Sequence, residues 1–228
     1  MSESVIVTLP DGKELTLAAG ATVLDVASEI GPGLAKAALA GRIDGQLVDL
    51  RAPIRSDAAV SIVTIKDDEG GDVIRHSAEH VMADAVKRLF PNAQVDAGRT
   101  DHSEKFQYDF LVDEPFTPED LERIEKEMNK ILAEGATFER QVMTRDEAAD
   151  FFRGLGEELK LSRLGDIPDD AEITIFRHGD FADLCRGPHV NNTKQIGAVK
   201  LTEAEGTYFR GDEAGRERQG SYGTGFES

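Results

Sequence analysis

The sequence predicts an α+β protein in which a small β-grasp (ubiquitin-like) domain precedes a larger α+β domain. Short runs of alternating apolar and polar residues, separated by turn residues, fill the first 65 positions. From residue 73 onward, segments with helical apolar spacing are interspersed with strands. A length of 228 residues suits two modest domains. We therefore expect a first domain over 1–65, a polar, glycine-bearing linker over 66–72, a second domain over 73–213 and a tail or linker over 214–228.

The first domain is predicted to open with a β-hairpin. Apolar residues alternate with polar ones over 5–9 and again over 15–17, and Pro10-Asp11-Gly12 between them is typical of a turn. The segment 22–25 has the capping-box pattern of a helix start, and Gly31-Pro32-Gly33 predicts the end of that helix. Short strands are expected after it at 42–44, 46–50 and 60–65.

The second domain is predicted to contain three helices and several strands. The apolar stripe within Val73–Phe90 indicates a helix that Pro91 ends. Proline at the first helical position of Thr117-Pro118-Glu119-Asp120 indicates a second helix. A third helix is expected to start at Thr144 and to stop near Gly154. Strands are expected at 108–112, 172–177, 198–202 and 207–210.

The composition excludes several classes of protein. With 39% hydrophobic and 31% charged residues, the chain can bury a real core. The N-terminus lacks the features of a secretory signal, and the apolar runs are too short for a transmembrane helix. A single cysteine excludes a disulfide framework and favours a reducing compartment. We therefore expect a cytoplasmic protein that has no membrane partner.

The formal net charge of −18 argues against a generic, charge-driven binder of nucleic acid. The negative charge is unevenly distributed, however, because residues 113–158 hold 6 basic and 14 acidic residues whereas residues 177–210 hold 5 and 4. A local nucleic-acid site in the second segment would avoid most of the negative field. High acid content with few lysines also suits a salt-rich cytoplasm, in which salt screens the surface.

Two pairs of residues carry the candidate chemistry. His76 and His80 lie four apart on a predicted helix, so both rings project from one face. Cys185 and His189 lie four apart in a turn after a predicted strand. Three nitrogens and one sulfur suit a tetrahedral metal site, and they equally suit a metal-free acid/base cluster, because imidazole titrates near neutral pH. The remaining histidines are expected at the surface: His102 and His178.

These motifs carry a resemblance. His76-Ser77-x-x-His80 followed by Cys185-Arg186-Gly187-Pro188-His189 resembles the editing domain of threonyl-tRNA synthetases, and alanyl-tRNA editing domains share the pattern. Residues 1–65 look like the TGS domain that precedes editing in the threonyl enzymes. Residues 196–212 look like the end of that editing domain, and 218–226 look like the start of the link to the synthetic domain. No class II synthetase core follows, so this chain is not expected to charge tRNA.

The resemblance implies post-transfer editing, the hydrolysis of serine wrongly esterified to threonine tRNA. Serine lacks one methyl group of threonine, which is worth only ~1–3 kcal/mol of discrimination, so a second, hydrolytic site corrects the error. The implied partners are the aminoacylated 3′ end of tRNA and the remainder of the synthetase. No cofactor is expected to be required, and the open alternative is zinc on four residues: His76, His80, Cys185 and His189.

The resemblance also implies roles for individual residues. We expect the histidine cluster to position and deprotonate water, with His76 as the first choice for the base. Lys160 matches a catalytic lysine of the family and would orient water or stabilise developing charge. Asp183 would bind the α-ammonium of the substrate or orient a histidine, and Cys185 would shape the pocket. In the family's Gly-Phe-Tyr-Tyr-Asp segment, which reads Lys105–Asp109 here, Tyr108 would take the substrate-facing tyrosine role.

Two alternatives of other kinds remain open. One is an alanyl-type editing deacylase that removes serine or glycine from alanine tRNA. The β-grasp lead and the closing segment argue against it. The other is a non-enzymatic, zinc-stabilised tRNA-binding module, in which removal of the metal would unfold the chain and no tRNA would be deacylated.

Overall fold

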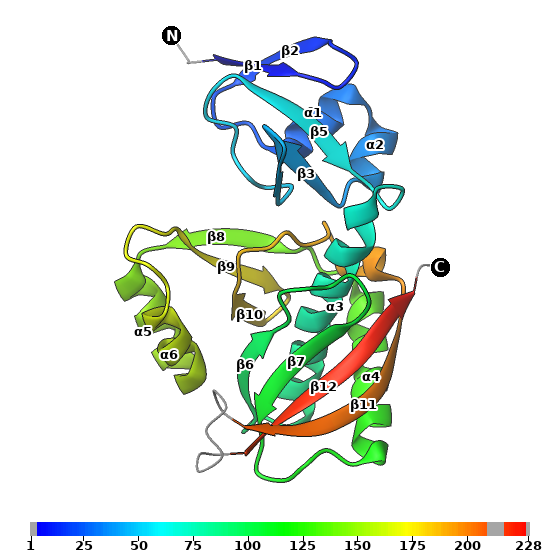
Figure 1. Cartoon of the computed structure of the whole chain (residues 1–228), viewed down its shortest axis with the longest axis vertical. Helices are drawn as coiled ribbons and strands as arrows, with labels where there is room; N and C mark the ends of the chain where they lie inside the picture. The colour runs from blue at the N-terminus through cyan, green and yellow to red at the C-terminus, as the bar shows by residue number, and fades with distance from the viewer. Residues whose placement is uncertain (1–3, 209–216, 227–228) are drawn as a thin grey trace. The chain divides into compact units, whose positions relative to one another are not determined.

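The chain folds into two compact units in the computed structural model, which describes residues 4–208 and 217–226. The first unit runs through Ile74 and also takes in Gly187–Asn191. The second unit runs from Arg75 to Arg186 and continues from Asn192. Both units combine helices with strands (Figure 1), which confirms the predicted α+β class.

The first unit is a five-stranded sheet with two helices. Its strand order is β2-β1-β5-β3-β4, in which β1 is parallel to β5 and the other pairs are antiparallel. Val26 of α1 packs against Val5 and Val7 of β1 in one apolar cluster, so the helix covers the sheet as a β-grasp requires. The elements are β1 (Ser4–Thr8), β2 (Glu14–Ala18), α1 (Val23–Ile30), α2 (Pro32–Ala37), β3 (Ala40–Ile43), β4 (Gln46–Val48) and β5 (Ala58–Val63).

The limits of α1 follow from its caps. The Thr22 hydroxyl accepts a hydrogen bond from the Asp25 backbone, and the Asp25 carboxylate accepts one from the Thr22 backbone, which is the predicted capping box. The helix ends at Ile30, before Gly31-Pro32-Gly33 as predicted, but the same segment also starts α2, which the sequence did not predict. Proline is favoured at the first position of a helix, so a Gly-Pro step can start a helix as well as end one.

The helix α3 (Asp68–Leu89) corrects the linker predicted over 66–72, because residues 68–72 belong to its first turns. Gly70 packs so closely on the preceding chain that a Cβ atom there would lie 2.4 Å from the Thr64 carbonyl oxygen. Asp68 and Glu69 complement the positive end of the helix dipole. The polar, glycine-bearing composition of residues 68–72 is typical of a flexible linker, but here these residues form the tightly packed start of a helix.

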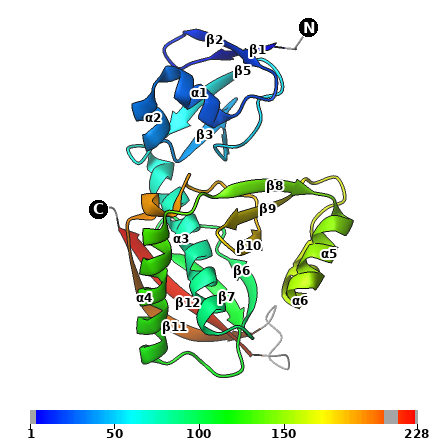
Figure 2. The same cartoon turned by 180° about the vertical axis from the view of Figure 1, so that it is seen from behind.

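The second unit places α3 and α4 against the same face of a four-stranded antiparallel sheet, ordered β11-β12-β7-β6 (Figures 1 and 2). A second, three-stranded antiparallel sheet, β10-β9-β8, shares an apolar cluster with α5 and α6. The elements are β6 (Gln94–Gly98), β7 (Phe106–Leu111), α4 (Pro118–Glu134), β8 (Glu139–Met143), α5 (Arg145–Leu155), α6 (Glu158–Gly165), β9 (Ile173–His178), β10 (Phe181–Leu184), a 3₁₀ turn (Thr193–Ile196), β11 (Ala198–Tyr208) and β12 (Glu217–Phe226).

The strand β12 corrects the tail predicted over 214–228. It pairs with β11 on one side and β7 on the other, so its backbone is hydrogen-bonded on both edges. That pairing outweighs the low strand propensity of its glycines. The strands predicted separately at 198–202 and 207–210 are one strand, β11, with an irregularity between Leu201 and Glu203. The end of the second predicted strand and the predicted boundary at 213 lie outside the described residues.

Four short elements of the second unit were not predicted: β6, β8, β10 and α6. β8 is an edge strand that carries charged residues, so it lacks a clean alternation of apolar and polar side chains. β10 has only 4 residues and contains the buried Asp183. Both strands form by pairing with β9. In the case of β8, the paired strand β9 lies about 30 residues further along the chain. In the described part of the chain, no helix is long and apolar enough to cross a membrane.

The cap of α4 provides a test of the fold. Thr117 makes a full capping box with Asp120 at the start of a helix that buries Ile124 and Met128. We expect Thr117→Ala to lower the free energy of unfolding by about 1 kcal/mol in urea titrations, because the Asp120 backbone N–H loses its acceptor and the Asp120 carboxylate loses the hydroxyl donor. The matched exposed substitution Glu122→Ala on the same helix should change it by less than about 0.5 kcal/mol. Equal effects would show that the cap does not stabilise α4.

Candidate active site

The helix α3 positions the first pair of predicted site residues. His76 and His80 lie on one side of it, with their rings edge to face and their centroids 5.7 Å apart. Residues 77–86 are all buried, so α3 is enclosed on every side rather than along one stripe. His80 is accordingly only 2% exposed, in contact with the rings of Tyr108 and Phe181.

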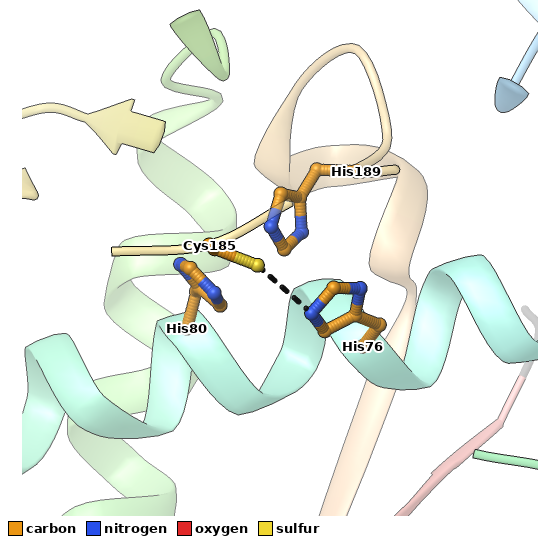
Figure 3. Close-up of side chains that lie close together, drawn as sticks. All are labelled: His76, His80, Cys185 and His189. Carbon is orange, nitrogen blue, oxygen red and sulfur yellow. Dashed lines mark hydrogen bonds between the residues drawn. The ribbon is translucent and has the colours of Figure 1, made fainter. Parts of the chain in front are cut away.

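The chain after β10 brings Cys185 to the same helix. The Cys185 backbone N–H donates to the Thr174 carbonyl oxygen at 3.1 Å, which extends the pairing of β10 with β9 by one residue. The Cys185 Sγ atom lies 3.2 Å from His76 Nε2, as the dashed line in Figure 3 shows. Two residues that are 109 positions apart in sequence are thus in direct polar contact.

His189 completes the predicted set of four (Figure 3). One donor atom from each residue of the set lies within 4.8 Å of the others: His76, His80, Cys185 and His189. Three imidazole nitrogens and one thiolate are a donor set that fits zinc. These four residues would therefore hold a zinc ion, which would act as a Lewis acid toward a bound carbonyl or water.

Behind the histidines lies a buried polar network around Asp183. Lys160 Nζ is 2.6 Å from Asp183 Oδ1 and also donates to the Tyr108 hydroxyl at 2.9 Å and to the Asp96 carbonyl oxygen at 2.8 Å. The Tyr108 hydroxyl donates to Asp183 Oδ2. The relative exposure of Lys160 is 3%, that of Tyr108 3% and that of Asp183 0%. The network joins α6, β7, β6 and β10 at one point.

The environment fixes the protonation of this network. Burial alone would raise the pKa of the Asp183 carboxyl, but the Lys160 ammonium and then His80 outweigh it, so this pKa lies below its ordinary value. Burial, followed by the charge of Asp183, raises the pKa of the Tyr108 phenol well above its ordinary value. Asp183 is therefore a carboxylate and Tyr108 a neutral hydrogen-bond donor at neutral pH.

A pocket of about 250 Å³ opens beside these groups. Five of the seven predicted site residues line it: His76, His80, Tyr108, Lys160 and Cys185. His189 and Asp183 are not among its lining residues. Because Asp183 is fully buried and lies 3.9 Å from His80 Nε2, its contacts favour the orienting role over direct binding of a substrate ammonium.

The predicted surface positions of the two remaining histidines were wrong. The His102 side chain is only 11% exposed, and its Nε2 lies 3.0 Å from the buried Glu79 carboxylate. The His178 side chain is 1% exposed, with Nε2 3.3 Å from Asp84 Oδ2 and the ring against Phe138 and Phe181. Both partners are acidic residues of α3. Glu79 and Asp84 lie beside the predicted apolar stripe, where acidic residues normally face solvent, so no local signal indicated that they are buried against histidines.

Two known protein families match this chain, one in its first part and one in its last part. Residues 5–64 match the TGS domain family, and residues 173–219 match the "Threonyl and Alanyl tRNA synthetase second additional domain" family. The second match contains Cys185 and His189. The chain therefore contains matches to a TGS domain and to the second additional domain of the threonyl and alanyl synthetases.

Curated relatives extend this similarity over nearly the whole chain. The threonine–tRNA ligase of Pelobacter propionicus is 48% identical over 223 residues, which are 98% of this chain and 35% of that relative. The threonine–tRNA ligase of Geobacter sp. (strain M21) is 49% identical over 220 residues, which are 96% of this chain and 34% of that relative. The chain thus spans about a third of the length of the relatives that it matches.

The buried ion pair can be tested by its effect on stability. Lys160→Met keeps most of the side-chain volume but leaves the Asp183 carboxylate buried without its cation, so we expect a loss of about 3–5 kcal/mol in the free energy of unfolding. The double variant Lys160→Met/Asp183→Asn should recover part of that loss, because no buried charge then remains unpaired. The exposed pair of Arg153 with Asp150 provides the control, and Arg153→Ala should cost about 0–1 kcal/mol. A loss below 1 kcal/mol for Lys160→Met would contradict the account.

Proposed function

We propose that this chain, which carries the TGS domain and the second additional domain of threonyl-tRNA synthetases, hydrolyses the ester of mischarged seryl-tRNA for threonine. The single observation that carries the proposal is the pocket in which two histidines, a buried ammonium and a buried phenol face one space. Ester hydrolysis needs an activated water, a stabilised oxyanion and a protonated leaving oxygen. The residues around the pocket offer a group for each requirement.

His76 is the proposed general base. Its ring lines the pocket, and its Nε2 contacts Cys185 Sγ, which fixes the orientation of the imidazole. In the proposed reaction His76 takes a proton from a water molecule while the water oxygen attacks the ester carbonyl carbon. When the tetrahedral intermediate collapses, the bond between that carbon and the ribose oxygen breaks. The imidazolium then returns its proton to the ribose oxygen, so free serine and intact tRNA leave.

Lys160 is the proposed source of positive charge for the oxyanion. Its ammonium is buried, so its field is weakly screened, and the Asp183 and Tyr108 contacts fix its position before a substrate arrives. Asp183 is proposed to hold both Lys160 and His80 in place. Tyr108, held neutral by burial, is proposed to meet the seryl side chain, while Cys185 shapes the wall of the pocket beside His76.

The tRNA end is proposed to approach through a part of the surface that carries little negative charge. Three arginines are among the lining residues of the pocket: Arg99, Arg163 and Arg186. Arg163 is held by the Asp96 carboxylate through two hydrogen bonds, whereas the Arg186 residue is exposed. Cations at the mouth of a pocket attract the phosphates next to a terminal ribose. The remainder of a synthetase, in the cytoplasm, is the proposed source of the mischarged substrate.

Alanine substitutions test these roles with seryl-tRNA for threonine in single-turnover assays. We expect His76→Ala to slow deacylation by about 10²–10⁴-fold, because the general base is lost, and Lys160→Ala by about 10²–10³-fold, because the oxyanion loses its cation. Cys185→Ala should slow deacylation about tenfold, because the His76 imidazole loses a contact that orients it, although no covalent step passes through sulfur. Lys126→Ala, an exposed lysine on α4, is the matched control for charge. Thermal melts of each variant separate loss of fold from loss of chemistry.

Undiminished rates in both His76→Ala and Lys160→Ala would overturn the proposal. Parallel assays with seryl-tRNA for alanine distinguish the alanyl-type deacylase, which would act faster on that substrate. Melts in the presence of a chelator distinguish the zinc-stabilised binding module, which would unfold without metal and deacylate neither tRNA.

A further inference from the structure

Glu79 is a buried carboxylate beside the proposed site that sequence reasoning did not identify. It lies on α3, between His76 and His80, and is 1% exposed. Its Oε1 atom accepts hydrogen bonds from the backbone N–H groups of Arg99, at 3.2 Å, and Gln107, at 3.0 Å. These two amides flank the loop between β6 and β7, so one carboxylate fastens both ends of that loop to α3.

The absence of a side chain at Gly98 leaves room for the Glu79 carboxylate. A Cβ atom at Gly98 would lie 2.2 Å from Glu79 Oε2, so the last residue of β6 leaves the space that this oxygen fills. A buried carboxylate is stable only when donors or cations surround it. Two backbone amides supply part of that requirement, and the His102 side chain lies next to the same oxygen, with its Nε2 3.0 Å from Oε1.

His102 joins this carboxylate to the proposed base. Its ring lies against the ring of His76, with the centroids 4.6 Å apart and the planes tilted by 32°. The Nε2 atom of His76 also meets Cys185 Sγ at 3.2 Å. The His76 imidazole therefore contacts both the His102 ring and the Cys185 sulfur. The Arg75 side chain donates to the His102 carbonyl oxygen, which anchors the loop next to it.

We infer that Glu79 and His102 are positioning residues for His76: Glu79 anchors the loop that carries His102, and the His102 ring fixes the His76 imidazole with Nε2 toward Cys185. This role rests on the proposed function of His76 as general base. Neither residue takes part in bond making. Displacement of a reacting group by about 1 Å can cost about 10²-fold in rate, so a residue that only holds the base has a measurable effect on catalysis.

Comparison of His102→Ala with His102→Phe separates the packing of a ring against His76 from the polar contact of His102 with Glu79. We expect His102→Ala to lower kcat for deacylation of seryl-tRNA about tenfold or more with KM within about twofold, since substrate binding does not involve His102. His102→Phe keeps a ring against His76 and should restore kcat to within about threefold of the unsubstituted chain. Glu79→Ala should act in the same direction as His102→Ala, because the backbone N–H groups of Arg99 and Gln107 lose their acceptor and the loop that carries His102 loses its anchor. Glu104→Ala, an exposed acidic residue of the same loop, is the matched control.

Histidine-selective ¹⁵N NMR of the same variants gives a readout that is independent of tRNA. The His76 ring should show one tautomer in the unsubstituted chain and in His102→Phe, and averaged ring nitrogens in His102→Ala. If the chain deacylates no tRNA, the proposed function fails while this spectrum still tests the positioning role. An unchanged kcat and an unchanged His76 spectrum in His102→Ala would overturn the inference. So would ring signals of His76 and His102 that sharpen together only when zinc is added, because a metal ion between them and Glu79 would then be the cause.

Discussion

The Lys160–Asp183 ion pair is the interaction on which the rest of the candidate site depends. It is buried, 2.6 Å long, and joined to the Tyr108 hydroxyl and the Asp96 carbonyl oxygen, so four separate elements meet at one ammonium group. A buried ion pair contributes little net stability compared with apolar residues of the same size. In the proposed reaction its value lies in position: the charge of Lys160 is fixed before a substrate binds, so no reorganisation is needed when the oxyanion forms.

The helix α3 connects the Lys160–Asp183 pair to the histidines, because it carries His76 and His80, and His80 lies near Asp183. Its three buried ionisable residues each meet a partner from another part of the second unit: His80 near Asp183, Glu79 beside His102, and Asp84 beside His178. Acid–histidine contacts thus tie the helix to both sheets of the second unit. The acidic residues that contribute to the net charge of −18 therefore include exposed ones, such as Glu122 on α4, and buried ones beside the histidines, such as Glu79 on α3 and Asp183 on β10.

Local patterns predicted most of the first unit and the three long helices, because caps and apolar spacing act over a few residues. They failed where distant pairing decides the structure. The strand β8 forms by pairing with β9, and β12 forms by pairing with β7 and β11. The residues of β8 and β12 therefore lack a local pattern that predicts a strand. In the site, spacing and the family resemblance predicted the His76–Cys185 contact. They did not predict Glu79 or His102, because a short connecting loop gives no local signal that it folds back onto α3.

The central claim is that the pocket beside Lys160 and His76 admits a seryl ester and rejects a threonyl ester. Single-turnover deacylation of seryl-tRNA and threonyl-tRNA, both on the tRNA for threonine, measures this most directly. The account predicts that the seryl ester is hydrolysed about 10–200-fold faster, the range that one methyl group allows. Equal rates, or faster hydrolysis of threonyl-tRNA, would contradict it.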